Sequence, residues 1–182
     1  MIHICKYNWE YDKKSILEKV YVNKSIKKEM IGNTSLNTDE IMFVCPQFDS
    51  IKNFIVNEYF KLNNIYCCDY AFNMWTYIQN NQTTYERFHR HLKLDGGRSN
   101  IPAETTFVFY LQIPDNLKLD EGDLLIKLDN ENTYTFRPNE GDVIFFPADM
   151  LHTPKLTPSS NNDRVVIAGN ISRNFLNKKE LI

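Results

Sequence analysis

The chain has 182 residues and a mass of 21.5 kDa, which is the size of one folded domain. Apolar residues make up 42% of it and charged residues 24%, so a disordered or collagen-like chain is excluded. The net charge of −2 gives no reason to expect nucleic acid or an anionic membrane as a partner. No stretch approaches the roughly 20 apolar residues of a membrane span, and we see no secretory signal.

The four cysteines are expected to be reduced thiols. Cys5, Cys45, Cys67 and Cys68 contain no Cys-x-x-Cys pair, and their spacing does not support a zinc site. Apolar residues precede Cys45 and Cys67, which predicts buried thiols in a reducing compartment. We therefore expect a cytoplasmic protein.

Residues 1–66 are predicted to be mostly helical support for the rest of the chain. A short helix is expected over 12–20, with Asp12 at its N-cap. A stronger helix is expected over 50–62, because its apolar residues recur at helical spacing and an Asn-Asn pair follows it.

From residue 67 on, the pattern changes to short strands. Eleven of the 13 Gly and Pro residues lie beyond residue 95, and they divide segments rich in Phe, Tyr, Val, Ile and Thr. Strands are expected over 71–79, 84–91, 105–113, 123–128, 133–137, 142–147 and 164–171. Such short strands without alternating helices predict a mainly β fold with flanking helices, a sandwich or barrel. We expect a single domain over 1–182, with residues 67–175 as the β core.

Three of the four histidines follow a pattern that suits a metal ion. In Tyr-Glu-Arg-Phe-His-Arg-His at 85–91, strand alternation places His89 and His91 on one face. His152 follows an apolar strand that ends at Pro147, and in a jelly roll such a residue can face the pair across the barrel mouth. His3 is expected to be a surface or core residue without a functional role.

Arg164 opens an apolar strand and would share a face with Val166, Ala168 and Asn170. If it points inward it needs an anionic partner, because an unpaired buried guanidinium is very costly. Its planar fork matches a carboxylate. A surface or edge arginine paired with Asp163 or a similar acid is the alternative.

The motifs occur in a characteristic order. His-x-His at 89–91 precedes Gly-Asp-Leu at 122–124 and Pro-Asn-Glu-Gly-Asp-Val-Ile-Phe-Phe-Pro at 138–147, and His152, Arg164 and Asn170 follow. This set resembles the Fe(II)- and 2-oxoglutarate-dependent oxygenases of the prolyl-4-hydroxylase-like branch. Thr-Phe-Val-Phe-Tyr-Leu at 106–111 is similar to the family's central strand. The likeness covers roughly residues 70–175.

The resemblance implies a double-stranded β-helix, or jelly roll, with helices flanking one sheet. It implies that His89 and His152 bind Fe(II) and that Arg164 binds the distal carboxylate of 2-oxoglutarate. It places Tyr110 near this co-substrate, and Asn170 beside it or behind the histidine rings. The implied reaction uses dioxygen to hydroxylate an unactivated C–H bond, of a peptidyl proline or of a small molecule, and yields succinate and CO₂.

One position departs from the family pattern. The family has Asp or Glu two residues after its first histidine, where this chain has His91. Three neutral imidazoles leave the metal's charge uncompensated and suit zinc or copper as well as iron. Asp95 or Glu86 could supply the carboxylate instead, although Glu86 has the wrong strand parity. Two other functions stay open. One is a cupin-type three-histidine dioxygenase that does not use 2-oxoglutarate, and the other is a non-catalytic jelly-roll module that serves as a structural or binding protein.

Overall fold

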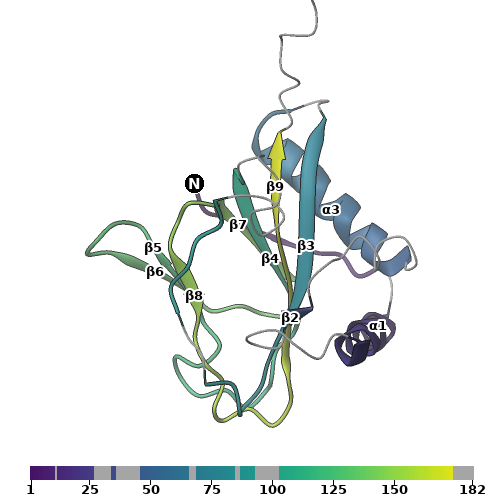
Figure 1. Ribbon diagram of the computed structural model, residues 1–182, viewed down its shortest axis with the longest axis vertical. Helices are drawn as coiled ribbons and strands as arrows, with labels where there is room; N and C mark the ends of the chain where they lie inside the picture. The colour runs from purple at the N-terminus through teal and green to yellow at the C-terminus, as the bar shows by residue number, and fades with distance from the viewer. Residues whose placement is uncertain are drawn as a thin grey trace, which may run out of the picture.

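The computed structural model describes residues 1–10, 12–26, 34–35, 46–65, 69–84, 87–92 and 103–173. Figure 1 shows two sheets, with both labelled helices along the outer side of one of them. The expected mainly β fold with helices on one face is therefore confirmed. Six of the seven expected strands are present within two residues of their predicted bounds. The single-domain organisation stays a prediction, and Cys45, Cys67 and Cys68 lie outside the described residues.

The large sheet holds six antiparallel strands. In spatial order they are β1 (His3–Lys6), β7 (Asp142–Pro147), β4 (Thr105–Gln112), β9 (Arg164–Arg173), β3 (Tyr70–Gln79) and β2 (Thr34–Ser35). Strand β9 pairs with β3 along its whole length and with β4 on its other side. The short strands β1 and β2 were not predicted.

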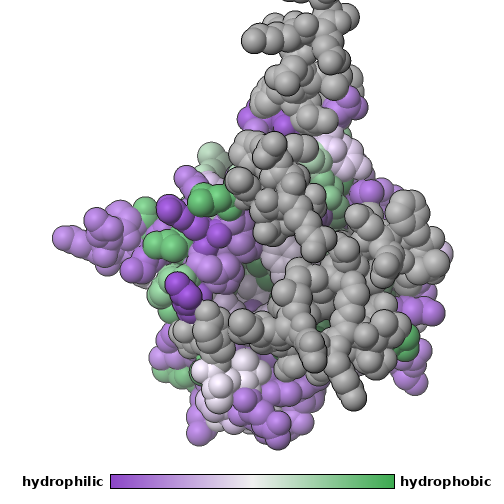
Figure 2. All heavy atoms as spheres, viewed as in Figure 1, coloured by the Kyte–Doolittle hydropathy of each residue, from purple (hydrophilic) through white to green (hydrophobic). Residues whose placement is uncertain are grey.

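The small sheet holds β6 (Thr133–Phe136), β5 (Leu124–Lys127) and β8 (His152–Pro154). The β5–β6 hairpin projects from the molecule, and its surface is mainly hydrophilic (Figure 2). Beside β8 runs the segment 87–92. His89 and His152 exchange backbone hydrogen bonds of 3.0 and 2.9 Å, and His91 N–H donates to the Ala148 carbonyl at 2.8 Å.

The predicted strand over 84–91 is wrong for the part of it that the structure describes. Residues 84 and 87–91 contain one isolated bridge, His89 to His152, and no named strand. The described part of the segment exchanges backbone hydrogen bonds with β8 only at His89, and the bond of His91 N–H goes to Ala148, which precedes β8. These bonds are too few to form a ladder. The bonds still fall on alternate residues, so His89 and His91 share a side as expected.

Both helices are longer than predicted. Helix α1 is Lys13–Ile26 and helix α3 is Pro46–Leu62. Helix α3 begins at a proline, which is favourable in the first turn because no N–H partner is needed there. It ends as expected at the Asn-Asn pair: Asn64 has a φ of 53°, and Ile65 N–H returns to the Phe60 carbonyl at 2.9 Å. No described helix is both long and apolar enough to cross a membrane.

The two faces of the large sheet bury different sets of side chains. The face toward the helices is apolar and packs against α1 and α3, through residues that include Phe107, Phe109, Phe145, Ile167, Ile16, Phe48 and Tyr59. The face toward the small sheet holds a second apolar cluster, which includes Val108, Tyr110, Ile144, Phe146, Val166, Leu124 and Ile126. Strand alternation thus separates a structural core from the interior of the barrel, where the site lies.

We expect Gly169→Ala to lower the free energy of unfolding by about 1–3 kcal/mol or more. A Cβ there would lie 2.2 Å from the Asn73 carbonyl oxygen and 2.4 Å from Phe107 Cζ, so the central strands would have to move apart. Urea unfolding measures the loss. The exposed Thr133→Ala change on β6 is the control and should alter stability by less than about 0.5 kcal/mol. Equal stability of the two variants would contradict this packing.

Candidate active site

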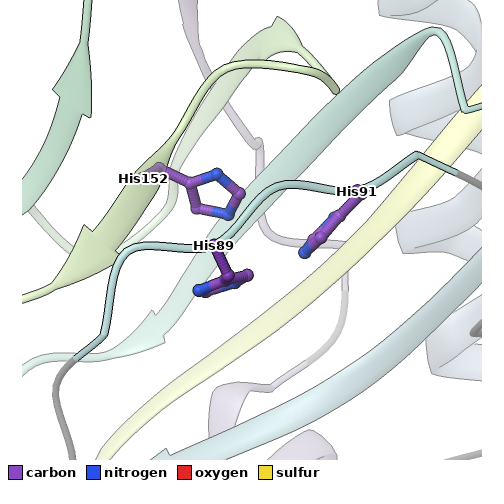
Figure 3. Close-up of side chains that lie close together, drawn as sticks. All are labelled: His89, His91 and His152. Atoms are coloured by element: carbon purple, nitrogen blue, oxygen red, sulfur yellow. The ribbon is translucent and has the colours of Figure 1, made fainter. Parts of the chain in front are cut away.

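The structure brings His89, His91 and His152 together in one cluster (Figure 3). Their ligand nitrogens lie within 4.8 Å of one another, and the ring centroids are 4.4 to 5.3 Å apart. His89 and His91 come from the segment 87–92, and His152 is the first residue of β8. His152 is buried, His91 is half-buried and His89 is exposed, so the cluster opens to solvent on one side.

Each imidazole is oriented through its Nδ1 atom. His89 Nδ1 lies 3.0 Å from the Arg87 carbonyl oxygen, and His152 Nδ1 lies 3.0 Å from that of Met150. A carbonyl oxygen only accepts, so each Nδ1 carries the proton and each Nε2 keeps a free lone pair. Hydrogen bonding of the non-ligating nitrogen is how metal-binding histidines are usually held.

His91 is held by side chains of the large sheet. Its Nδ1 donates to Asn170 Oδ1 at 2.8 Å, and the Thr106 hydroxyl, 3.2 Å from the same Nδ1, donates to that oxygen at 2.9 Å. The Trp75 ring meets the imidazole edge to face, with centroids 5.2 Å apart. Asn170 therefore lies behind a histidine ring, which is one of the two places expected for it. Thr106 and Trp75 had no individual signal in the sequence.

Burial keeps two of the rings neutral. It lowers the pKa of His91 to about 4 and that of His152 to about 3, and desolvation is the largest cause for both. The neighbouring imidazoles lower the pKa of His152 further. Both rings are therefore unprotonated at neutral pH, as metal binding requires. Within the described ranges no carboxylate joins the cluster, and the alternative ligands Asp95 and Glu86 lie outside these ranges.

Arg164 points into the barrel and is 1% exposed. Its Nε and Nη1 atoms have no hydrogen-bond partner among the described residues, and no described carboxylate forms an ion pair with it. The alternative of a surface arginine paired with Asp163 is therefore wrong. A buried guanidinium with unused donors is a place for an anion that the protein itself does not supply.

A second buried polar group, the Tyr110 side chain, lies against Arg164. The guanidinium carbon is 5.2 Å from the centre of the buried Tyr110 ring, whose hydroxyl also lacks a described partner. Burial raises the pKa of Tyr110 to about 12, against the opposite effect of Arg164, so the phenol stays protonated and can donate. Gly122 lies close to both Arg164 and Thr157: a Cβ on Gly122 would lie 3.7 Å from Arg164 Cδ and 3.4 Å from Thr157 Cγ2. The buried Thr157 hydroxyl also has no hydrogen-bond partner among the described residues. Thr157 follows no sequence motif and was not predicted.

One cavity of about 200 Å³ joins the histidine cluster to Arg164. Its remaining walls are mostly apolar, formed by residues that include Trp75, Tyr77, Val108, Leu124, Val166 and Ala168. A metal-type cluster and a buried cation therefore share one largely apolar chamber, in which electrostatic contacts are stronger than in water.

No family model and no curated protein matches the sequence. Solved structures do match the fold. A prolyl 4-hydroxylase from Pseudomonas putida superposes with a TM-score of 0.67 and 14% identity, over 94% of this chain and 92% of that one. The fold is that of a prolyl hydroxylase. The jelly roll that the motifs implied is thereby confirmed.

Two other matches have the same fold at equally low identity. A prolyl 4-hydroxylase from Phytophthora capsici has a TM-score of 0.65 and 14% identity; the match covers 92% of this chain but only 57% of that one. A prolyl hydroxylase from Trichoplax adhaerens, in complex with a peptide fragment of the hypoxia inducible factor oxygen degradation domain, has a TM-score of 0.62 and 12% identity, over 94% and 83%. At such identities the likeness concerns the fold, and the chemistry must be argued from the site.

We expect ¹⁵N NMR to show the His91 and His152 rings neutral, with the proton on Nδ1, from about pH 7.5 down to about pH 5. The reason is that burial places both pKa values, about 4 and about 3, below this range. In Asn170→Ala, His91 should lose its Nδ1 preference, whereas His152, bonded to Met150, should keep it. A midpoint near about 6.5 for either ring in the unmodified protein would contradict this picture.

Proposed function

We propose that the protein is an Fe(II)- and 2-oxoglutarate-dependent oxygenase that hydroxylates an unactivated C–H bond. The observation that carries this proposal is the buried Arg164 guanidinium, which has two donors without a partner among the described residues and shares a cavity with His89, His91 and His152. A metal cluster alone would fit many enzymes. Arg164 also requires an anion in the same cavity, and this combination fits a metal enzyme with a dicarboxylate co-substrate.

The donor set of the cluster fits iron. His89, His91 and His152 would each bind through Nε2, since their Nδ1 atoms are engaged with oxygen acceptors. Imidazole suits iron, and three protein ligands leave the other coordination positions open for small ligands. Asn170 would act as a positioning residue through His91.

The surroundings of Arg164 fit the distal carboxylate of 2-oxoglutarate. The guanidinium would bind this carboxylate, and the protonated Tyr110 hydroxyl beside it could donate a further hydrogen bond. Binding would thus satisfy buried polar atoms of Arg164 and Tyr110 that have no partner among the described residues.

When bound, Fe(II) together with 2-oxoglutarate and dioxygen supplies oxidation of a C–H bond to an alcohol, with formation of succinate and CO₂. The chain holds and orients these reactants. The three imidazoles hold the metal, Arg164 fixes the co-substrate, and apolar walls such as Val108 and Val166 exclude water from the chamber.

For the substrate we propose a prolyl side chain of a peptide, with a small molecule as the alternative. The structural neighbours are prolyl hydroxylases, and the Trichoplax enzyme was solved with a peptide. The exposure of His89 gives a peptide access to the metal side of the cavity. Succinate formation that rises with proline-containing peptides, and not with free proline, would support the peptide class.

We also propose a cytoplasmic location. Cys5 is a free thiol in the described structure, and reduced thiols are typical of the cytoplasm. An Fe(II) enzyme also benefits from reducing surroundings.

A specific observation favours one rival function. His91 in place of a carboxylate matches a cupin-type three-histidine dioxygenase that needs no 2-oxoglutarate, and in that case Arg164 would serve the fold. A non-catalytic jelly-roll module is the other rival. The three functions differ in metal uptake and in the effect of 2-oxoglutarate.

We expect Arg164→Met to raise the 2-oxoglutarate concentration for half-maximal succinate formation by about 30-fold or more, because losing one partner of a buried charged pair costs about 2–5 kcal/mol. Arg164→Lys keeps the charge and should lose less. Arg90→Ala, an exposed change between two of the histidines, is the control and should leave the value unchanged.

An anaerobic titration with Fe(II) and 2-oxoglutarate separates the rivals. The proposal expects a visible charge-transfer band that His152→Ala abolishes and that Arg164→Met shifts to higher 2-oxoglutarate concentration. Metal uptake without any effect of 2-oxoglutarate would establish the three-histidine alternative. No metal uptake at the histidine cluster would leave the non-catalytic module.

A further inference from the structure

A second group of metal-binding side chains lies between strand β1 and helix α3. The ligand atoms of His3, Cys5 and Glu58 all lie within 4.8 Å of one another, and all three residues are partly buried. The group shares no residue with the histidine cluster. His3, expected from the sequence to have no role, is thus one of three side chains that converge.

The sheet register explains why these side chains meet. His3 and Cys5 alternate on β1 and lie opposite Phe145 and Val143 of β7, whose side chains face the helices. They therefore point to the side of the large sheet that α3 covers, away from the barrel interior. Glu58 reaches this side from α3, and its side chain is only 16% exposed.

We propose that His3, Cys5 and Glu58 form a second metal site, of the zinc type. Thiolate, imidazole and carboxylate are the three ligand types that zinc takes in proteins, and three protein ligands leave a fourth position open. A neighbouring cavity of about 450 Å³, lined in part by Cys5 and Glu58, gives that position access to water or a small ligand. Sulfur ligation distinguishes this site from the all-imidazole cluster.

The distances suit closure on a metal ion. In a tetrahedral site with bonds of about 2.0–2.3 Å, ligand atoms are about 3.3–3.8 Å apart. The three atoms, within 4.8 Å of one another, need to move inward by only about 1 Å. Side-chain rotation on a strand and a helix that already pack together can supply this movement.

A cation already lies at the carboxylate. Lys61 Nζ contacts Glu58 Oε1 at 2.5 Å, and the Lys61 side chain is 72% exposed. The ammonium group neutralises Glu58 when no metal is bound, and it can swing into solvent when one is. Lys61 therefore competes with the metal for Glu58, so removing the Lys61 charge should strengthen metal binding.

We expect Co²⁺, a spectroscopic substitute for zinc, to give a thiolate-to-cobalt charge-transfer band with one equivalent bound at this site. The band should persist in His152→Ala, which disables the other cluster, and disappear in Cys5→Ser. The variant Cys45→Ser/Cys67→Ser/Cys68→Ser keeps Cys5 as its only thiol and should retain the band.

Two charge variants on α3 sharpen the test. Lys61→Gln should tighten Co²⁺ binding by about two- to fivefold, since it removes a competing exposed ion pair. Glu58→Gln should weaken binding by at least about tenfold, because it removes a ligand. A structural role of Cys5 alone would produce neither change.

The proposal is overturned if the band is absent from the unmodified protein, or if it persists after Cys5→Ser. Loss of the band in His152→Ala would show that cobalt binding at Cys5 depends on the histidine cluster and would also overturn the proposal of an independent site. If the triple serine variant does not fold by circular dichroism, the comparison of unmodified protein with Cys5→Ser decides. None of these outcomes bears on 2-oxoglutarate binding, so this site and the proposed oxygenase function can fail separately.

Discussion

Strand β9 is hydrogen-bonded on both edges and buried on both faces. It fixes the positions of the core beneath the helices, of Arg164 and of the residue that anchors His91. Its odd-numbered residues, such as Val165 and Ile167, enter the core beneath the helices, while Arg164 and Asn170 face the barrel. A shift by one residue would exchange the two sets and destroy both, so the register is strongly fixed. Arg164 and Asn170 are consequently held about 20 Å apart on one rigid element. The anion site and the anchor of His91 are thus set by the same strand.

The electrostatics of the cavity depend on the missing carboxylate. With three imidazoles and a guanidinium, and no acidic ligand among the described residues, a bound divalent metal would leave the chamber strongly positive. Such a chamber retains anions and disfavours cationic guests, because apolar walls screen charge poorly. A dianionic co-substrate would offset both the metal and Arg164. A histidine at position 91, in place of a carboxylate, is therefore compatible with an anion bound at Arg164, because the anion supplies the negative charge that the ligand set lacks.

Much of the fold could be predicted because its signals are local. Six strands and the end of α3 are marked by alternation, turn residues and the Asn-Asn pair, and these act over a few residues. Strand β1 was missed because His-Ile-Cys-Lys is short and its partner β7 lies more than 130 residues away. The segment of His89 looked like a strand because its composition is that of one, yet few backbone partners reach it.

Some site residues could be predicted from sequence motifs, whereas the placement of others required the fold. The order of motifs indicated His89, His152 and Arg164, but only the fold could decide that Arg164 points inward and that no described carboxylate pairs with it. Thr106 lies in a segment that resembles the family's central strand, but its contact with Asn170 and His91 depends on residues far away in the sequence. The convergence of His3 and Cys5 with Glu58 joins elements more than 50 residues apart, which no local pattern records.

The three histidines are anchored in two different ways. His89 and His152 are tied to each other through their backbones, and each ring is tied to a carbonyl two residues before it, so they move as one unit. His91 is instead anchored to Asn170, 79 residues away on the large sheet. The cluster therefore spans the seam between the two sheets. A small sliding of one sheet over the other would change the distance from the His91 ring to the other two rings. The separation of the two sheets and the spacing of the three ligand nitrogens are therefore coupled.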